Sequence, residues 1–275
     1  MPFAVSIAIL GLVQAALVAL PAPRSLPWVV GLRSRWWALV PALSIAVVIA
    51  VIELDSGSAT ALSYLALVAV PPLAALALGL LLRGSRSVWA LAAIPLFALA
   101  WASPGSLAGE AAATALSGLA CIALGWLLVS VVPDLWLRLG IYAMAAIDTW
   151  FVASDLLQGP NAVLSAAAPG GGLPRLQAVH FGSALMGFGD LFIAALTGCL
   201  LANPKPPADG PQTRHIDTFQ AHRQLYCAAL VAVLALAFDL LFFAVNELPA
   251  TVPVAVALAL VQRSSSSRRA PPRPA

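Results

Sequence analysis

The sequence predicts an all-α, polytopic transmembrane protein, and three observations indicate this class. Of the 275 residues, 61% are hydrophobic and only 9% carry a charge. A soluble domain needs charges at roughly 25% of its positions, so this chain has too few to cover a water-exposed surface. Apolar runs recur along the chain, and Trp28, Trp36 and Trp136 stand at the ends of such runs, where amphipathic rings meet the bilayer–water boundary.

Nine segments have the composition of a membrane span. A hydrocarbon core about 30 Å thick takes about 20 helical residues to cross. Cutting the sequence at charges and at Pro/Gly clusters predicts helices at residues 2–21, 36–53, 59–82, 88–103, 111–132, 136–157, 180–202, 222–246 and 249–262. They are expected to form one transmembrane domain, 1–262, with helices one to five in 1–132 and helices six to nine in 136–262.

Two connections are longer than the others, and the chain ends in a polar tail. Residues 158–179 are rich in Gly, Pro and Ala, and residues 203–221 are polar with several prolines. Both are expected to be loops. The tail, 263–275, is basic and of low complexity, which predicts a disordered segment.

The charges of the short loops predict the orientation. Arg24, Arg33 and Arg35 follow the first span, whereas Glu53 and Asp55 follow the second. The next two loops continue the alternation, with arginines in one and Glu110 in the other. Because positively charged loops stay in the cytoplasm, the N-terminus is expected outside and the C-terminal tail inside, in the cell membrane.

Several other functions find no support in the sequence. The net charge of +3 is scattered over short loops, so no nucleic-acid partner is expected. Cys121, Cys199 and Cys227 lie far apart inside apolar segments and are predicted to be buried hydrophobic residues. A polar stretch holds His215, Asp217 and His222, but no further ligand cluster lies near it in the sequence. We therefore expect no metal site and no cofactor.

Acidic residues inside apolar spans require a reason, because each costs about 2.5–3.5 kcal/mol in the hydrocarbon region. Asp148, Asp190 and Asp239 are embedded in spans six, seven and eight. Consecutive spans run antiparallel, so Asp148 and Asp190, both near the middle of a span, are expected at similar depth. Two carboxyl groups in one low-dielectric site do not ionise together readily, which leaves one acid and one base to activate a water.

Three short motifs surround these positions. They are Ile147-Asp148-Thr149-Trp150, Gly187-Phe188-Gly189-Asp190 and Leu248-Pro249-Ala250-Thr251. In order, span number and spacing they resemble the three signatures of presenilins and signal peptide peptidases, which are intramembrane aspartyl proteases. The resemblance covers about residues 136–262, whereas spans one to five match only in number.

This resemblance implies a presenilin-like fold and hydrolysis of peptide bonds within transmembrane helices, so the partners would be membrane-embedded protein or peptide substrates. It implies catalysis by Asp148 and Asp190. It also implies that the active site is supported by Gly187, Gly189, Pro249, Ala250 and Thr251. The chain departs from the family pattern at two positions: Ile147 replaces the usual aromatic residue, and Thr251 replaces a leucine.

Other interpretations remain open at this point. Prepilin peptidases share the Gly-x-Gly-Asp fragment, but the basic residue that usually follows their aspartates is missing here. A proton-coupled transporter or a non-enzymatic membrane scaffold could use the same carboxyl pair. Asp155, seven residues after Asp148, is an alternative first aspartate. Asp239 is expected to make an interhelical hydrogen bond.

Overall fold

The computed structural model describes residues 1–23, 31–40, 43, 47, 57–154, 167, 169–203, 213–243 and 248–267, most of which are helical. The α-helices are α1 (Phe3–Ala19), α3 (Gly57–Leu76), α4 (Ala93–Ala102), α5 (Leu107–Val131), α6 (Asp134–Ala153), α8 (Phe188–Ala202), α9 (Thr213–Asp239) and α10 (Val252–Ser267). Short 3-10 or π segments are η2 (Arg35–Leu39), η3 (Ala77–Leu81), η4 (Ser87–Ala92) and η5 (Leu240–Phe243). Two strands, β1 (Ala178–Phe181) and β2 (Ala184–Gly187), precede α8.

Four helical segments are long and apolar enough to cross a membrane: Ala59–Leu81, Leu107–Val131, Asp134–Ala153 and Gln220–Asp239. Four shorter apolar helices accompany them at Phe3–Ala19, Ser87–Ala102, Phe188–Ala202 and Val252–Ser264. These segments fall where spans one and three to nine are expected. The second expected span, 36–53, lies largely outside the described residues. A helical architecture of membrane type is therefore present, and the count of nine spans stays a prediction.

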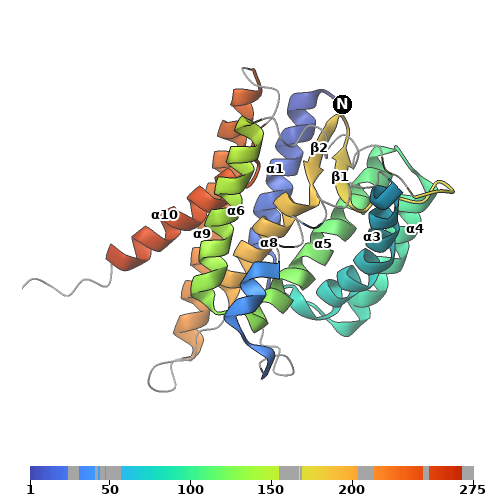
Figure 1. Ribbon diagram of the computed structural model, residues 1–275. Coiled ribbons are helices and arrows are strands. Elements are labelled where there is room, and N and C mark those ends of the chain that lie inside the picture. Colours follow the sequence, from blue (N-terminus) through green and yellow to red (C-terminus); the bar gives the residue numbers. More distant parts are fainter. Residues whose placement is uncertain are drawn as a thin grey trace, which may run out of the picture.

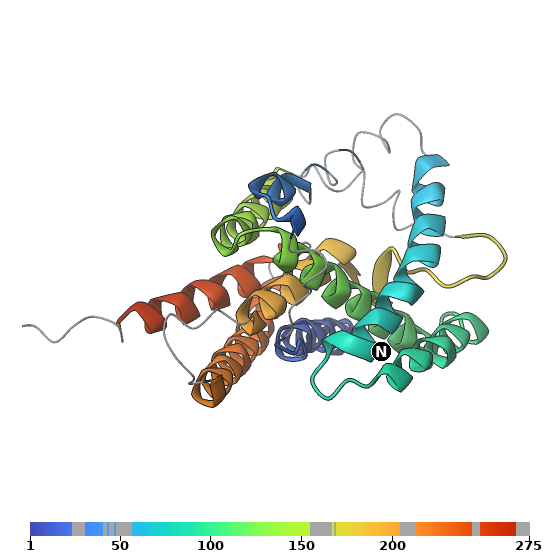
Figure 2. The same cartoon turned by 90° about the horizontal axis from the view of Figure 1, so that it is seen from below.

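Helix α8 lies at the centre of the bundle, packed against α5 on one side and α1 on the other (Figure 1). Glycines allow this close approach, because a Cβ at Gly198 would lie 2.6 Å from the carbonyl oxygen of Val18. A Cβ at Gly125 of α5 would lie 3.3 Å from the Leu196 backbone. In lipid the hydrophobic effect does not drive helices together, so their association depends on close packing. Small residues at such crossings let the helix backbones come into contact. Figure 2 shows α3 and α4 on the opposite side of α5 from α6, α9 and α10.

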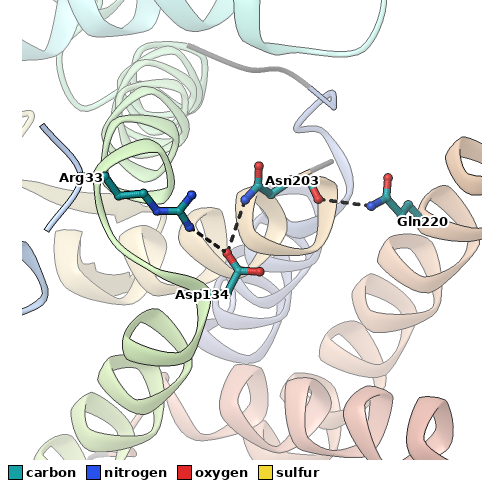
Figure 3. A network of polar contacts seen from close by, with 4 residues as sticks. All are labelled: Arg33, Asp134, Asn203 and Gln220. Carbon is teal, nitrogen blue, oxygen red and sulfur yellow. Dashed lines mark hydrogen bonds and ion pairs between the residues drawn. The ribbon is translucent and has the colours of Figure 1, made fainter. Parts of the chain in front are cut away.

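Polar contacts join the helices at one end of the bundle. Arg33 forms an ion pair with Asp134 at the start of α6, 3.9 Å apart. Asn203, which follows α8, donates from Nδ2 to Asp134 Oδ1 at 3.5 Å, and Gln220 of α9 donates to the Asn203 carbonyl at 3.2 Å (Figure 3). The Arg83 guanidinium donates to Gln224 Oε1 of α9 and thereby joins η3 to the same end. We call this the basic end.

A β-hairpin corrects the predicted start of the seventh span. Strands β1 and β2 are antiparallel, with Phe181 paired to Ala184 across a two-residue turn. Gly182 has φ +61°, a conformation that tight hairpin turns require and glycine adopts without strain. The Gly182 amide donates to Glu110 Oε2 at 2.7 Å and the Ser183 amide to Ser6 Oγ at 3.3 Å. Residues 180–187 therefore do not belong to a helix, and α8 begins at Phe188.

Two further boundaries differ from the prediction. Helix α9 begins at Thr213, so residues 213–221 of the expected loop are helical. Helix α10 continues to Ser267, so residues 263–267 of the expected disordered tail are helical as well. Neither stretch contains Pro or Gly, and polar residues alone do not end a helix. The remainder of the tail, 268–275, and most of the loop 158–179 lie outside the described residues.

Candidate active site

The contact between Asp134 and Asn203 sets the relative heights of Asp148 and Asp190. Asp148 follows Asp134 along α6, and Asp190 precedes Asn203 along α8 by nearly the same number of residues. At 1.5 Å per residue both aspartates stand about 20 Å from the basic end. Because the two helices run antiparallel and touch there, the carboxyl groups come to similar heights along the bundle.

The Asp148 carboxylate meets the segment that opens α10. Thr251 Oγ1 donates a hydrogen bond to Asp148 Oδ2 at 2.6 Å, and the Thr251 side chain is buried with 2% of its surface exposed. Pro249 is buried as well, and Ala250 is half-buried. Helix α10 also packs against both α6 and α8. The third motif thus lies directly beside the first aspartate.

Asp190 occupies a different position in its helix from the one expected. It lies in the first turn of α8 rather than near mid-helix, because the hairpin delays the start of that helix. Its Oδ2 atom accepts a hydrogen bond from the Gly187 amide at 3.2 Å, as a capping carboxylate does at a helix N-terminus. The carboxyl groups of Asp190 and Asp148 are close enough to interact electrostatically. α6 and α8 therefore bring both aspartates to one site.

Gln14 of α1 also belongs to the site, although none of the sequence motifs identifies it. Its side chain is buried, with 1% exposed, and Nε2 donates to the Ala250 carbonyl at 3.2 Å and to the Asp190 carbonyl at 3.5 Å. One amide therefore links the helix of the second aspartate to the third motif. A signal was available, because a lone amide within an apolar span indicates an interhelical contact.

Replacing Gln14 by Leu is expected to lower the free energy of unfolding by about 1–3 kcal/mol, since two carbonyl oxygens in the bundle lose their side-chain donor. Thermal unfolding of the purified protein in detergent measures this change. Leu12 provides the control on the same helix, because half of its side chain is exposed and Leu12→Ala should change stability much less. Equal effects of the two substitutions would contradict the linking role of Gln14.

The two glycines before Asp190 differ in their surroundings. A Cβ at Gly187 would lie 3.2 Å from Asp190 Oδ2, so the Asp190 carboxylate disfavours any larger residue at this position. A Cβ at Gly189 would meet no atom within 4 Å. Among the described residues, no backbone from another segment lies within 4 Å of a Cβ at either glycine. Gly189 instead borders open space beside the carboxyl pair.

The other candidate residues lie apart from this arrangement or outside the described part of the chain. Asp239 of α9 faces Gly11 of α1, where a Cβ would lie 3.8 Å from Asp239 Oδ2. That oxygen is buried and finds no hydrogen-bond partner among the described residues, so the expected interhelical hydrogen bond is not seen there. Asp155 falls outside the described residues. His215 and Asp217 belong to the first turns of α9 rather than to a loop.

The hairpin also carries a titratable group. His180 of β1 is half-buried, and this burial together with the Arg175 guanidinium lowers its pKa, against a smaller opposing effect of Glu110. His180 is therefore mostly neutral at pH 7. β1 packs against α5 and β2 packs against α1. These two contacts hold the hairpin in place where the chain enters α8.

The arrangement offers two interacting carboxyl groups, a hydroxyl donor on one of them, a backbone donor on the other, and open space next to Gly189. Such a pair can hold a water and exchange protons with it. Comparisons with models of known protein families, with functionally characterised proteins and with solved structures find no significant match to this chain.

Proposed function

We propose that the chain is an intramembrane aspartyl protease of the presenilin and signal peptide peptidase type, with Asp148 and Asp190 as its catalytic pair. The observation that carries the proposal is the meeting of three motifs far apart in the sequence. Thr251 binds the Asp148 carboxylate, and Gln14 binds the backbone of Asp190 and Ala250. A chain that used these residues only to fasten neighbouring helices would have no need to pair two acids.

The chemistry requires no group beyond the two carboxyls and a water. One carboxylate takes a proton from the water as its oxygen attacks the peptide carbonyl carbon. The other carboxyl, protonated at the start, gives its proton to the departing nitrogen. The C–N bond breaks, and the products are a carboxylic acid and an amine. The pair ends with the proton on the opposite carboxyl, and exchange with water restores the starting form.

A substrate helix must unwind locally before this attack, because intrahelical hydrogen bonds shield its carbonyls. Within the described ranges, no further strand pairs with the outer edges of the two-stranded hairpin that leads into Asp190. An extended peptide can add to such an edge as a further strand. The open space at Gly189 lies immediately after β2, so a strand added there would end beside the carboxyl pair.

Cleavage of a reporter transmembrane helix by the purified protein in lipid vesicles tests this proposal. We expect new termini within the apolar part of the reporter, mapped by mass spectrometry. We also expect inhibition by a peptide analogue that carries a hydroxyl group in place of the scissile carbonyl, since it resembles the tetrahedral intermediate. An intact reporter together with no binding of the analogue would contradict the protease assignment.

We further propose that the basic end faces the cytoplasm of the cell and that the N-terminus lies outside. Arg33, Arg83 and Arg138 gather at the basic end, whereas Glu110 lies at the opposite end with the hairpin. A reporter enzyme that works only in the cytoplasm should be active when it is fused after Arg269 and inactive when it is inserted before Phe3. A reporter enzyme that works only outside the cytoplasm should show the opposite pattern. The reverse pattern would refute this orientation.

A further inference from the structure

The hydroxyl group of Thr197 in α8 is buried within the bundle. Its side chain is 0% exposed, and Oγ1 has no hydrogen-bond partner among the described residues. Thr114, Thr149 and Ser130 differ from it, because each donates to the carbonyl four residues earlier in its own helix at 2.7 Å. A buried hydroxyl without a partner costs about 1–3 kcal/mol. Thr197 therefore requires a small polar partner from outside the described residues.

Thr197 lies on the side of α8 that also carries Asp190. Seven residues, nearly two helical turns, separate the two positions, so both side chains leave the helix in about the same direction. Other sides of α8 are occupied. A Cβ at Gly125 of α5 would lie 3.2 Å from Cys199 Sγ, and Gly198 lies against the α1 backbone. Thr197 thus points away from α5 and α1, about 10 Å from Asp190 along the helix axis.

A small cavity lies on the same side of α8, at the basic end. Leu200 and Leu201 line it about one turn, or 5 Å, beyond Thr197. The cavity offers about 20 Å³ to the centre of a water molecule, and one water needs about 10–15 Å³. Arg138 Nε and Gln220 Oε1 in its lining are buried, and neither atom has a hydrogen-bond partner among the described residues. One donor and one acceptor in a space of this size suit a single water.

The position of Thr197 between the cavity and the carboxyl pair gives its hydroxyl a use. Hydrolysis consumes a water, and the pair must exchange protons with water afterwards. A water inside the bundle gives up the hydrogen bonds of the bulk, and an apolar surrounding replaces none of them. A hydroxyl can accept and donate at the same time. Thr197 therefore lowers the cost of a water in the apolar stretch between the basic end and Asp190.

We propose that Thr197 and the cavity at the basic end form a water route to the carboxyl pair of Asp148 and Asp190. Arg138 and Gln220 bind the outer water, and the Thr197 hydroxyl binds the next water toward Asp190. A proton passes Thr197 when its oxygen accepts a proton from one water and its own proton goes to the other, so the hydroxyl is unchanged. The catalytic use of this route rests on the proposed function, whereas its existence does not.

Hydrogen–deuterium exchange at a thiol tests the route without measuring proteolysis. In the purified protein, Cys121, Cys199 and Cys227 are replaced by Ala, and infrared spectroscopy follows the S–H band of Thr197→Cys as it becomes S–D in heavy water. The matched control keeps Cys199 as the single cysteine, because it lies two residues farther along α8, is equally buried and faces Gly125 of α5. We expect exchange about tenfold faster or more at position 197, although burial alone predicts equal rates.

Cleavage kinetics of Thr197→Val and Thr197→Ser provide the second measurement. Val keeps the volume without the hydroxyl, so kcat should fall about tenfold while the midpoint temperature of unfolding is unchanged or raised. The solvent deuterium isotope effect on kcat should increase in the Val variant, because proton exchange with the pair becomes slower. Ser keeps the hydroxyl and should stay within about threefold of the unchanged protein.

The two measurements separate the water route from the protease assignment. Equal exchange rates of the two thiols would overturn the route, and so would a Val variant with unchanged kcat and an unchanged isotope effect. A Val variant that loses stability while its isotope effect stays the same would show that Thr197 only packs the bundle, which also overturns the proposal. Faster exchange at position 197 in a protein that cleaves no reporter would support the route and count against the protease.

Discussion

Asn in place of either Asp148 or Asp190 is expected to reduce cleavage of a transmembrane reporter by about 10²–10⁴-fold, the contribution that a positioned acid or base makes to such reactions. Asn has nearly the shape of Asp but cannot take up or release the proton that the pair must exchange. Because the two groups act as a unit, the double variant should be no slower than the worse single variant. Product formation with time, measured at saturating reporter, gives the comparison.

Asp239→Asn is the matched control for this experiment. Asp239 is a third aspartate in an apolar helix, and it faces Gly11 of α1 rather than the carboxyl pair. Its replacement should leave cleavage within about threefold of the unchanged protein, since it is not asked to transfer a proton. The midpoint temperature of thermal unfolding should be unchanged or slightly raised in the Asp148 and Asp190 variants, because one of two interacting acids is removed. Cleavage that survives in either variant would end the catalytic assignment.

The positions of most helices could be predicted because hydropathy and length reflect the solvent directly. An apolar run such as 107–131 has no other way to satisfy its backbone in lipid than to form a helix. The paired aspartates could be predicted for the same reason, because acidic groups in that setting are costly and need a partner. Their similar depth follows from the nearly equal distances of Asp148 and Asp190 from the ends of their helices.

The hairpin could not be read from hydropathy, since residues 178–187 are mostly apolar and lead directly into the apolar helix α8. The competing signal was local: Val179 and Phe181 favour strands, and Gly182-Ser183 suits a two-residue turn. Pairing between β1 and β2 then places Asp190 in the first turn of α8. The sequence spacing alone predicts that residue near the middle of a span.

Contacts between distant segments were beyond any local pattern. Thr251 and Asp148 are separated by 103 positions, and Gln14 lies 236 positions before Ala250. The third motif indicated which segment should approach the aspartates, but not which atom would do so. Thr251, one of the two positions where the chain departs from the motifs that it resembles, is the residue whose hydroxyl binds the carboxylate.

Replacing Thr251 by Val is therefore expected to slow cleavage by about tenfold to a hundredfold. Val has almost the same volume but lacks the hydroxyl, and hydrogen bonds to charged groups contribute about 1.5–3 kcal/mol. Without this donor Asp148 loses the contact that fixes its carboxylate beside α10. The loss should appear in kcat rather than in KM, because the hydroxyl orients the reacting group and does not bind the bulk of the substrate.

Thr251→Ser separates orientation of the carboxylate from simple packing. Ser keeps the hydroxyl and loses only a methyl group, so kcat should stay within a fewfold of the unchanged protein, with a modest loss of stability from the small cavity. Thr251→Leu, which introduces the residue usual at this place in the presenilins and signal peptide peptidases that the motif resembles, should behave like Thr251→Val if the hydroxyl is what matters here. A Ser variant as slow as the Val variant would show that the methyl packing, rather than the hydrogen bond to Asp148, sets the geometry of the site.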